Sequence, residues 1–381
     1  MSHIFNTNYE KKCIVIINSD RRAINARSLK IGRSLSKNNY NVQILTWDRT
    51  ATKPKHELID GCSIHNFRFK IPNLEKYTIL PFYSIWWAYV VLYLIKTKRI
   101  DAVHPLNLYN LIPSLIVKMR KKKIIYDLTD SISDSLAWSS HTKIFLYHMQ
   151  NNLIKLVDGV ILVDEHRRHQ INLPKNKKNA IVMNTCEDCF FSTTTTSSRT
   201  FQVYCGGWLS ESRGINHILR AVMNLDNVKL TLAGYGPYEN ALNEFNNDPK
   251  IEYLGVINPI DSYRLTANAD VIVAFYDPTI KINTLASPNK IFEAMMCSKP
   301  IIANYEAIPI AKIIKQYNCG ILVPYGDVSA IKTAIVLLMN DCSLKTSLGK
   351  NGRAAFVSKY DWRFMEKRLI FLYKSILSNT K

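Results

Sequence analysis

The sequence predicts an α/β protein of two doubly wound domains, each with a mainly parallel sheet covered by helices on both faces. Three observations lead to this prediction. The chain has 381 residues, which fits two domains better than one. Short β-rich runs alternate with helical stretches, and the same alternation starts again in the second half. Between the two series lies a polar segment of low complexity, STTTTSSRT at 192–200, which is expected to be a linker.

The first domain is expected over residues 1–191. Helical stretches at 23–37 and 108–120 lie between its β-rich runs. Because strand, helix and strand follow one another at short spacing, the strands are expected to be parallel. The expected strands are 13–17, 42–46, 102–104, 123–127, 160–163 and 180–183.

The second domain is expected over residues 201–360. The chain then ends in the segment 361–381, which contains an amphipathic helix at 362–377. Since no strand follows this helix, it must pack on an existing surface, and we expect it to return to the first domain. The expected strands of the second domain are 201–205, 228–233, 251–254, 271–275, 300–303 and 320–323, with helices that include 215–223, 288–296 and 328–339.

The composition is that of a globular protein with a large core. Apolar residues make up 47% and charged residues 21%, which excludes disorder over most of the chain. The formal net charge is +20, and most of the excess lies in residues 1–190. Such an excess indicates anionic partners, which are phosphates, acidic lipid headgroups or nucleic acid. No motif that reads nucleic acid is visible, so nucleic acid is not an expected partner.

The cysteines do not resemble a disulfide scaffold. Most of the eight stand in apolar runs, where they are expected to be buried. Cys186 and Cys189 form one C-x-x-C pair, but a structural zinc would need a second pair of ligands, and none matches. The first residues lack the apolar region of a signal peptide. These features indicate a reducing, cytoplasmic compartment.

Residues 77–95 form an uncharged, aromatic segment that needs separate treatment. Its length reaches the lower limit for a membrane-spanning helix, but its interspersed Tyr and Trp residues are typical of a membrane interface. Lys96, Lys98 and Arg99 follow directly. Three interpretations remain open: a buried core helix, a helix on the membrane surface, and a true span.

In open α/β sheets, ligands bind beyond the carboxyl ends of the strands, so the residues that follow strands are the candidates for chemistry. Gly206, Gly207 and Arg213 follow the strand 201–205 and precede the helix 215–223. Glycines let a ligand approach the backbone, a helix N-terminus attracts anions, and arginine can bind phosphate oxygens. A tight turn with a surface arginine would look the same in sequence.

A second group of candidates opens the helix at 288–296. Ser287 is expected to be the N-cap, and Pro288 suits the first helical position. Lys290 near the start of a helix has the wrong sign for the helix dipole, and an anionic ligand there would compensate it. Glu293, three residues further on, could accept hydrogen bonds from a ribose. The alternative is a simple surface pair between Lys290 and Glu293.

Weaker candidates complete the set. Gly234 and Gly236 end the strand 228–233, and we interpret them mostly as a structural corner. The sequence contains no Asp-x-Asp pair and no histidine spacing for a metal, so no metal is expected. In the first domain, side chains that could face an acceptor are Asp20, Arg21, Arg27, Asp127 and Asp130, although helix caps and solvated turns would look alike.

Four motifs together resemble the GT-B glycosyltransferases, specifically the retaining enzymes of glycosyltransferase family 4. The likeness covers nearly the whole chain, and the last motif is the most specific because it looks like the carboxyl half of the family's Glu-x7-Glu motif. The motifs are GGWLSESRGINHIL at 206–219, LAGYGP at 232–237, IEYLGVI at 251–257 and SPNKIFEAMMCSKPIIA at 287–303.

The resemblance implies two Rossmann-like domains that face a cleft, with a nucleotide-diphosphate sugar held by the second domain. Arg213 stands where the family has a basic residue for the donor diphosphate, and Lys290 lies by the phosphates. Glu293 stands at the second Glu of the motif, which the family uses on the ribose. The donor-binding set is then Gly206, Gly207, Arg213, Gly234, Gly236, Ser287, Pro288, Asn289, Lys290 and Glu293, with Arg213, Lys290 and Asp130 as catalytic candidates.

The sequence departs from the family pattern at two positions. Leu285 occupies the place of the first Glu of the motif, and Trp208 stands where many members carry a second phosphate-binding Arg. The expected activity is transfer of a sugar, with retention, to an acceptor hydroxyl in polysaccharide, glycoconjugate or lipid-linked glycan synthesis. We expect the enzyme at the inner face of the cell membrane. The alternatives are a non-hydrolysing sugar-nucleotide epimerase of the same fold and a catalytically weakened partner subunit.

Overall fold

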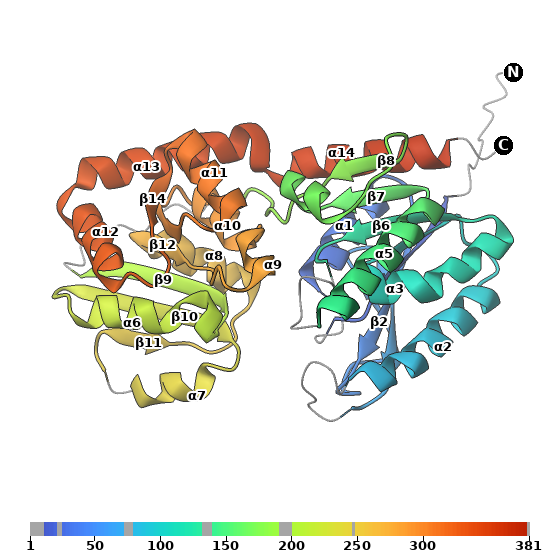
Figure 1. The fold of residues 1–381 in the computed structure, drawn as a ribbon, viewed down its shortest axis with the longest axis horizontal. Coiled ribbons are helices and arrows are strands. Elements are labelled where there is room, and N and C mark those ends of the chain that lie inside the picture. Colours follow the sequence, from blue (N-terminus) through green and yellow to red (C-terminus); the bar gives the residue numbers. More distant parts are fainter. Residues whose placement is uncertain are drawn as a thin grey trace, which may run out of the picture. The chain divides into compact units, whose positions relative to one another are not determined.

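The computed structural model describes residues 11–20, 25–71, 79–131, 139–189, 200–245 and 248–378. The candidate Arg21, most of the expected linker 192–200 and the first two residues of the aromatic segment lie outside these ranges. The chain forms two compact units (Figure 1). Unit 1 is Met1–Val182 with Glu366–Lys381, and unit 2 is Met183–Met365. Each unit has a sheet with helices around it, so the predicted pair of α/β domains is confirmed.

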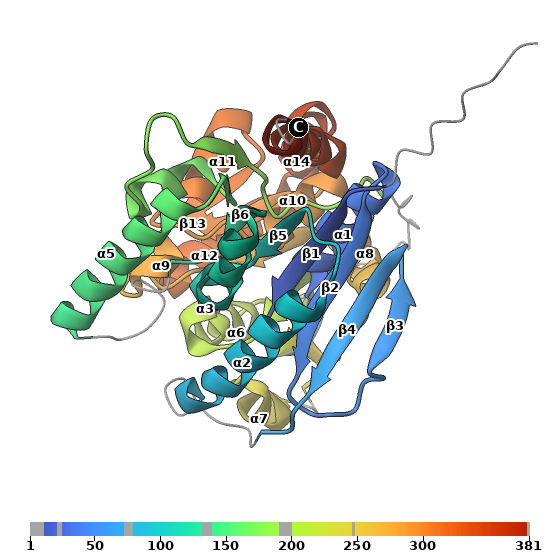
Figure 2. The ribbon, with the colours of Figure 1, turned by 90° about the vertical axis from the view of Figure 1, so that its right-hand side faces the viewer.

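Unit 1 contains an eight-stranded sheet in the order β3-β4-β2-β1-β5-β6-β7-β8. All neighbouring strands are parallel except β3 and β4, which pair antiparallel at one edge (Figure 2). The central strand β1 is buried along its whole length, as a strand covered on both faces must be. The strands are β1 (Cys13–Asn18), β2 (Asn41–Asp48), β3 (His56–Ile59), β4 (Cys62–Arg68), β5 (Ala102–Pro105), β6 (Lys123–Leu128), β7 (Gly159–Leu162) and β8 (Lys178–Ile181).

The sequence analysis missed the hairpin of β3 and β4. Its turn is Asp60-Gly61, and both residues have positive φ, 53° and 76°. An Asp-Gly pair between two short strands is a strong hairpin signal, but the outer strand, which has only four residues and is half polar, obscured it. The single helix predicted at 108–120 is also interrupted, because Pro113 lies in it and the chain continues as a 3-10 helix from Leu115. The helices of unit 1 are α1 (Ala26–Lys37), α2 (Leu80–Lys96), α3 (Asn107–Ser114), η1 (Leu115–Arg120), α5 (Ser140–Leu156), η2 (Glu165–Gln170) and most of α14 (Trp362–Leu377).

Helix α2 holds the aromatic segment and has two different faces. Trp86, Val90 and Leu94 are fully buried in the core of unit 1, and Trp86 stacks on Trp47 with ring centroids 5.9 Å apart. The opposite face is exposed and mostly apolar. Among the described residues, no helix is both long enough and apolar enough to cross a membrane. The exposed residues of this second face follow a helical spacing; apart from the polar Ser84, they are Pro81, Ile85, Ala88, Leu92 and Ile95.

Unit 2 contains a six-stranded, fully parallel sheet in the order β11-β10-β9-β12-β13-β14. The predicted helices at 215–223, 288–296 and 328–339 all form, to within one residue at each end. The strands are β9 (Phe201–Trp208), β10 (Val228–Tyr235), β11 (Ile251–Tyr253), β12 (Val271–Ala274), β13 (Ile301–Asn304) and β14 (Gly320–Val323). The helices are η3 (Glu211–Arg213), α6 (Ile215–Met223), α7 (Glu239–Leu242), η4 (Asn243–Phe245), α8 (Pro259–Asn268), α9 (Lys281–Thr284), α10 (Asn289–Met296), α11 (Ile308–Tyr317), α12 (Val328–Asn340), α13 (Cys342–Ala355) and η5 (Phe356–Tyr360).

Candidate functional site

The order of strands in unit 2 points to one place on the sheet. After β9 the chain adds β10 and β11 on one side, and then crosses to add β12 on the other side. The strand order therefore reverses between β9 and β12. Ligands of open α/β sheets bind at such a switch point, beyond the carboxyl ends of the strands. The glycine turn that we singled out, Gly206-Gly207, lies at the carboxyl end of β9.

Glycines are concentrated near the carboxyl ends of β9 and β10. Gly207 and Gly234 have φ of 116° and 143°, in the region that favours glycine. A Cβ on Gly234 would lie 1.8 Å from the carbonyl oxygen of Gly207, so the ends of β9 and β10 approach too closely for any side chain. Gly236 is held in the same way against the carbonyl oxygen of Leu209, at 2.0 Å. The packing of the chain on itself therefore accounts for Gly234 and Gly236, whereas a Cβ on Gly207 would meet only Lys290 Cε, 3.9 Å away.

Lys290 lies beside this turn. Its Cε is 3.2 Å from the position that a Cβ on Gly206 would take. Its ammonium lies 2.7 Å from Glu293 Oε2 and 2.8 Å from Ser262 Oγ, and the ring centroid of Tyr204 is 5.8 Å away. Burial lowers the pKa of Lys290, but Glu293 and Tyr204 outweigh it, so that the pKa is raised above its ordinary value. We had expected an anionic ligand to compensate this cation; within the chain, Glu293 already does so.

Arg213 is the second cation at this end of the sheet. Its guanidinium carbon lies 4.1 Å from the ring centroid of Tyr276, directly after β12. Its Nη1 atom is buried and has no hydrogen-bond partner among the described residues. Burial raises the pKa of Cys205 to about 12, and both Lys290 and Arg213 act against that shift. Two cations from distant segments therefore converge on the end of β9.

The start of α10 differs from the prediction. The predicted N-cap, Ser287, is wrong: Pro288 occupies the N-cap position and the helix begins at Asn289. The hydroxyl of Ser287 makes no cap and is buried without a hydrogen-bond partner. A buried hydroxyl or guanidinium nitrogen without a partner is costly, because it has lost its hydrogen bonds to water. The site therefore holds two polar atoms that the chain itself leaves unsatisfied.

Sequence reasoning missed three residues of this site. Tyr204 donates to or accepts from Ser262 at 3.0 Å, and Ser262 also contacts Lys290. Tyr276 provides the ring under Arg213. Tyr276 lies just beyond the carboxyl end of β12, so the rule that led to the glycines could have found it. Tyr204 lies in the middle of β9 and Ser262 lies within α8, and neither position carries such a signal.

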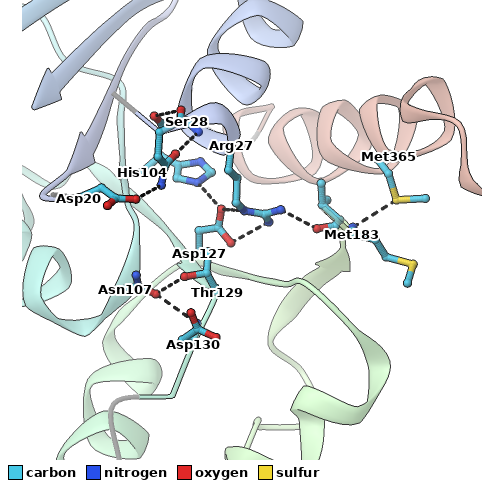
Figure 3. A network of polar contacts seen from close by, with 12 residues as sticks. Asp20, Arg27, Ser28, His104, Asn107, Asp127, Thr129, Asp130, Met183 and Met365 are labelled. Atoms are coloured by element: carbon cyan, nitrogen blue, oxygen red, sulfur yellow. Dashed lines mark hydrogen bonds and ion pairs between the residues drawn. The ribbon is translucent and has the colours of Figure 1, made fainter. Parts of the chain in front are cut away.

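Figure 3 shows four of the residues expected to face an acceptor, and two of them, Arg27 and Asp127, bind each other. Arg27 makes two bonds to Asp127, at 2.7 and 2.9 Å, and Nη1 of Arg27 donates to the carbonyl of Val182 at 2.9 Å. His104 bridges Asp127, at 3.3 Å, and the hydroxyl of Tyr373 in α14, at 2.6 Å. Burial alone would raise the pKa of Asp127, but Arg27 and His104 lower it below its ordinary value.

This network corrects our placement of Arg27 and Asp127 on the acceptor side. The side chains are 7% and 0% exposed, and both carboxylate oxygens of Asp127 already accept hydrogen bonds. Neither side chain is free to contact an acceptor, and we assign both to the stability of unit 1. The sequence analysis predicted that Asp127 lies near the end of a strand, but it did not predict that the side chains of Arg27 and Asp127 are buried.

Asp20 and Asp130 have a different environment. Asp20 is exposed and accepts a hydrogen bond from Asn25, the N-cap of α1, at 3.3 Å. Asp130 is 54% exposed, and its Oδ1 lies 3.0 Å from Arg167 Nη2. The side-chain oxygen of Asn107 accepts hydrogen bonds from the hydroxyl of Thr129 and from the backbone N–H of Asp130 (Figure 3). Of the expected acceptor residues that the structure describes, these two remain accessible.

Across the described ranges, no three His, Cys, Asp or Glu side chains lie close enough together to hold a metal ion.

The sequence matches a family of known proteins over part of its length and one relative over most of it. Residues 200–341 match the family model described as "Glycosyl transferases group 1". An uncharacterized glycosyltransferase of Methanocaldococcus jannaschii is 26% identical over 336 residues, which cover 84% of this chain and 85% of that protein.

Solved structures give the same result for the fold. Sucrose-phosphate synthase from Thermosynechococcus elongatus superposes with a TM-score of 0.75 at 17% identity, over 97% of this chain and 100% of that one. Anabaena HepE, solved in complex with UDP and glucose, gives a TM-score of 0.69 at 14% identity, over 95% and 99% of the two chains. With the two α/β units, these matches support a GT-B glycosyltransferase, and the stretch that matches the group 1 glycosyl transferases, residues 200–341, lies in unit 2.

Proposed function

We propose that unit 2 binds a nucleotide-diphosphate sugar and that the enzyme transfers the sugar to an acceptor hydroxyl with retention. One observation supports this most directly. Arg213 Nη1 and Ser287 Oγ are buried without partners, and both belong to the segments that the switch point brings together. A diphosphate would give both atoms a hydrogen-bond acceptor. HepE, which shares the fold, was solved with UDP and glucose.

The proposed donor site divides its contacts by chemistry. Arg213 and Lys290 face the diphosphate, because both cations converge on the end of β9. The backbone of Gly207, where a Cβ would meet only Lys290 Cε, lets a phosphate approach the main chain. Pro288 and Asn289 open α10, whose N-terminal N–H groups favour an anion. Glu293 holds Lys290 in place and accepts from the ribose.

The proposed mechanism rests on the leaving group. As the bond between sugar and phosphate breaks, negative charge grows on the departing diphosphate. Fixed donors that meet this charge lower the barrier, and Arg213 and Lys290 are such donors. Asp130 would orient the acceptor hydroxyl, since its carboxylate is half-exposed. No metal is part of this proposal, and we expect transfer to persist in the presence of a chelator.

Substitution of the donor-site charges tests the proposal. We expect Arg213→Ala to lower the rate of transfer about 10²–10³-fold, as removal of one preorganised donor does in other enzymes. Glu293→Ala should also lower it, because it removes the carboxylate that binds Lys290. The matched control is Arg264→Ala on α8, whose side chain is 62% exposed and pairs only with Asp261 among the described residues. Turnover is measured with a panel of nucleotide sugars, and urea unfolding checks the fold. Wild-type rates for both site variants would refute the assignment.

We further propose that the acceptor is a glycan carried by a membrane lipid and that the enzyme binds an anionic membrane peripherally. The exposed face of α2 is mostly apolar, and α2 contains no acidic residue. Exposed Lys96, Lys98 and Arg99 follow it directly. An apolar stripe next to basic side chains suits an interface with acidic headgroups.

Vesicle sedimentation tests the membrane proposal. The protein is expected to sediment with phosphatidylglycerol vesicles at low salt and to remain in solution with phosphatidylcholine. Ile85→Ser with Leu92→Ser should weaken this binding, because it removes exposed apolar area without touching the core. Equal sedimentation of the variant and the wild type, or none of either, would contradict the proposal.

The two alternatives are separated by the same donor panel. No observation on the described residues favours an epimerase. A weakened partner subunit was suggested by Leu285 and Trp208. Leu285 follows α9 as its C-cap, and Trp208 is 40% exposed and packs edge-on against Tyr235. Turnover of any donor shows that these departures leave the site active.

A further inference from the structure

Unit 1 has an open hollow of about 540 Å³ at the edge of its sheet opposite to the ligand edge. The hollow lies at the amino-terminal ends of β6, β7 and β8, because Lys123 begins β6, Asp158 precedes β7 and Lys178 begins β8. Helix α5 ends at the same place with Lys155. We call this feature the lysine hollow and define its polar wall as Lys123, Lys155, Asp158, Lys177 and Lys178.

The wall carries far more positive than negative charge. Four lysines line the hollow, against a single acidic residue, Asp158. That carboxylate is already occupied: Asp158 Oδ2 accepts from Lys118 and from the N–H of Ile124, and Oδ1 lies 3.3 Å from Lys123. In the part of the chain that the structure describes, Lys155, Lys177 and Lys178 form no ion pair. The charge at the hollow is therefore not balanced from within.

The contacts that these lysines do make leave hydrogen-bond donors unused. Lys155 donates to Asn152 Oδ1 at 2.9 Å, Lys177 donates to the carbonyls of Lys155 and Val157, and Lys178 donates to the carbonyl of Ser375. An ammonium has three N–H donors, so each retains at least one. Burial and the nearby Lys118 lower the pKa of Lys177, against the opposing effect of Asp158. A bound anion would relieve that repulsion.

Helix capping accounts for part of this arrangement. Lys177 and Lys178 bind carbonyls at the ends of α5 and α14, where a cation is favourable. Capping does not explain why Lys123 and Lys155 face the same hollow. Nor does capping explain why lysines from the starts of two strands and from the end of a helix line the same wall.

We propose that the lysine hollow is a binding site for a phosphate-bearing anion, a phosphomonoester or a diphosphate, distinct from the donor site in unit 2. The volume lies in the range of small-molecule sites. Lysine binds phosphate as a point charge, and several lysines can share one dianion. The ligand could be a soluble phosphate compound or the headgroup of a lipid, since both present the same group.

Titration with inorganic pyrophosphate tests the proposal on the full chain. The Arg213→Ala variant serves as the background, so that the donor site contributes little to the signal. Calorimetry at low salt should show binding, and Lys155→Gln with Lys178→Gln should weaken it by about tenfold or more. The matched control, Lys53→Gln with Lys55→Gln, removes the same charge from exposed positions in unit 1 and should bind as tightly as the background.

The outcomes separate cleanly. Absence of pyrophosphate binding, or equal weakening in the hollow variant and the control, would overturn the proposal. Lys155→Gln alone, which touches no backbone carbonyl through its ammonium, gives a second variant if the double substitution disturbs α14; it should weaken binding by about threefold. Because the background lacks Arg213, a failure of the proposed sugar transfer would leave this result intact.

Vesicles identify the source of the phosphate. Phosphatidic acid presents a phosphomonoester, which can carry two negative charges, and phosphatidylglycerol presents a phosphodiester with one, so the two kinds of vesicle are matched in total lipid charge. Stronger binding to phosphatidic acid, lost in the Lys155→Gln and Lys178→Gln variant, would assign a lipid headgroup. Pyrophosphate binding without this preference would assign a soluble ligand.

Discussion

Each unit of this glycosyltransferase has a cluster of charged residues near the carboxyl ends of its strands, but only the cluster in unit 1 is complete. There, Arg27, Asp127, His104 and Tyr373 bind one another, and both oxygens of Asp127 are occupied. In unit 2, Lys290 is bound by Glu293, whereas Arg213 Nη1 and Ser287 Oγ have no partner.

The difference between the two clusters distinguishes residues that stabilise the fold from residues that are available to bind a ligand. A buried charge that the chain itself neutralises ties distant segments together: the unit 1 network joins α1, β5, β6 and α14. A buried polar atom that the chain leaves unpaired costs free energy in the absence of ligand. Such a cost is tolerated where a ligand regains it, which is why we place the donor in unit 2.

The largest effect is expected from breaking the complete cluster. Asp127→Ala leaves Arg27 buried without a counter-charge and should lower the free energy of unfolding by about 3–5 kcal/mol. Urea unfolding measures this. Asp60→Asn is the matched control, because its pair with Arg33 is partly exposed, and it should cost less than about 1 kcal/mol. Similar values for the two variants would show that the unit 1 network does not stabilise the fold.

A smaller effect is expected from pH. The pKa of Asp127 is lowered in the folded chain, so its contribution is fully present above its ordinary pKa of about 3.9 and is lost as the pH falls toward the lowered value. The difference in unfolding free energy between the wild type and Asp127→Asn should therefore be larger at pH 7 than at pH 3. Urea unfolding at both pH values measures it, and a constant difference would contradict the assignment.

The smallest effect is expected in the incomplete cluster. Ser287→Ala removes a hydroxyl that has no partner, so the free energy of unfolding should stay within about 0.5 kcal/mol of the wild type or rise. Donor binding should weaken by about threefold to tenfold, which corresponds to one hydrogen bond. Ser358→Ala, whose hydroxyl binds the backbone of its own helix, is the control for donor binding. Unchanged donor affinity in Ser287→Ala would remove this residue from the site.

Much of the fold could be predicted because it depends on local pattern. The run that became β12 is wholly apolar and the one that became β1 is apolar up to its last residue, Asn18, as expected of strands covered on both faces. The hairpin of β3 and β4 was missed because its outer strand has only four residues, two of which are polar. Gly206, Gly207, Arg213 and Lys290 could be identified because glycines and cations stand directly after strands or at the start of a helix.

The environment of the site residues could not be predicted in the same way. Arg27 and Asp127 are 100 residues apart in sequence, and nothing local shows that they form a buried pair rather than a surface for an acceptor. Ser262 and Tyr276 joined the site through the packing of α8 and β12 beside β9.

The amino-acid sequence alone determined the two α/β domains, the glycine turns and the excess of positive charge, since these follow from residue type and short-range spacing. The tertiary structure decided which charges are paired and which polar atoms stay unsatisfied. It also gathered lysines from separate segments around one hollow. Pairing depends on distances between segments that are remote in the chain, and burial sets how strongly each charge interacts with its neighbours. Both quantities exist only after the sheets have assembled.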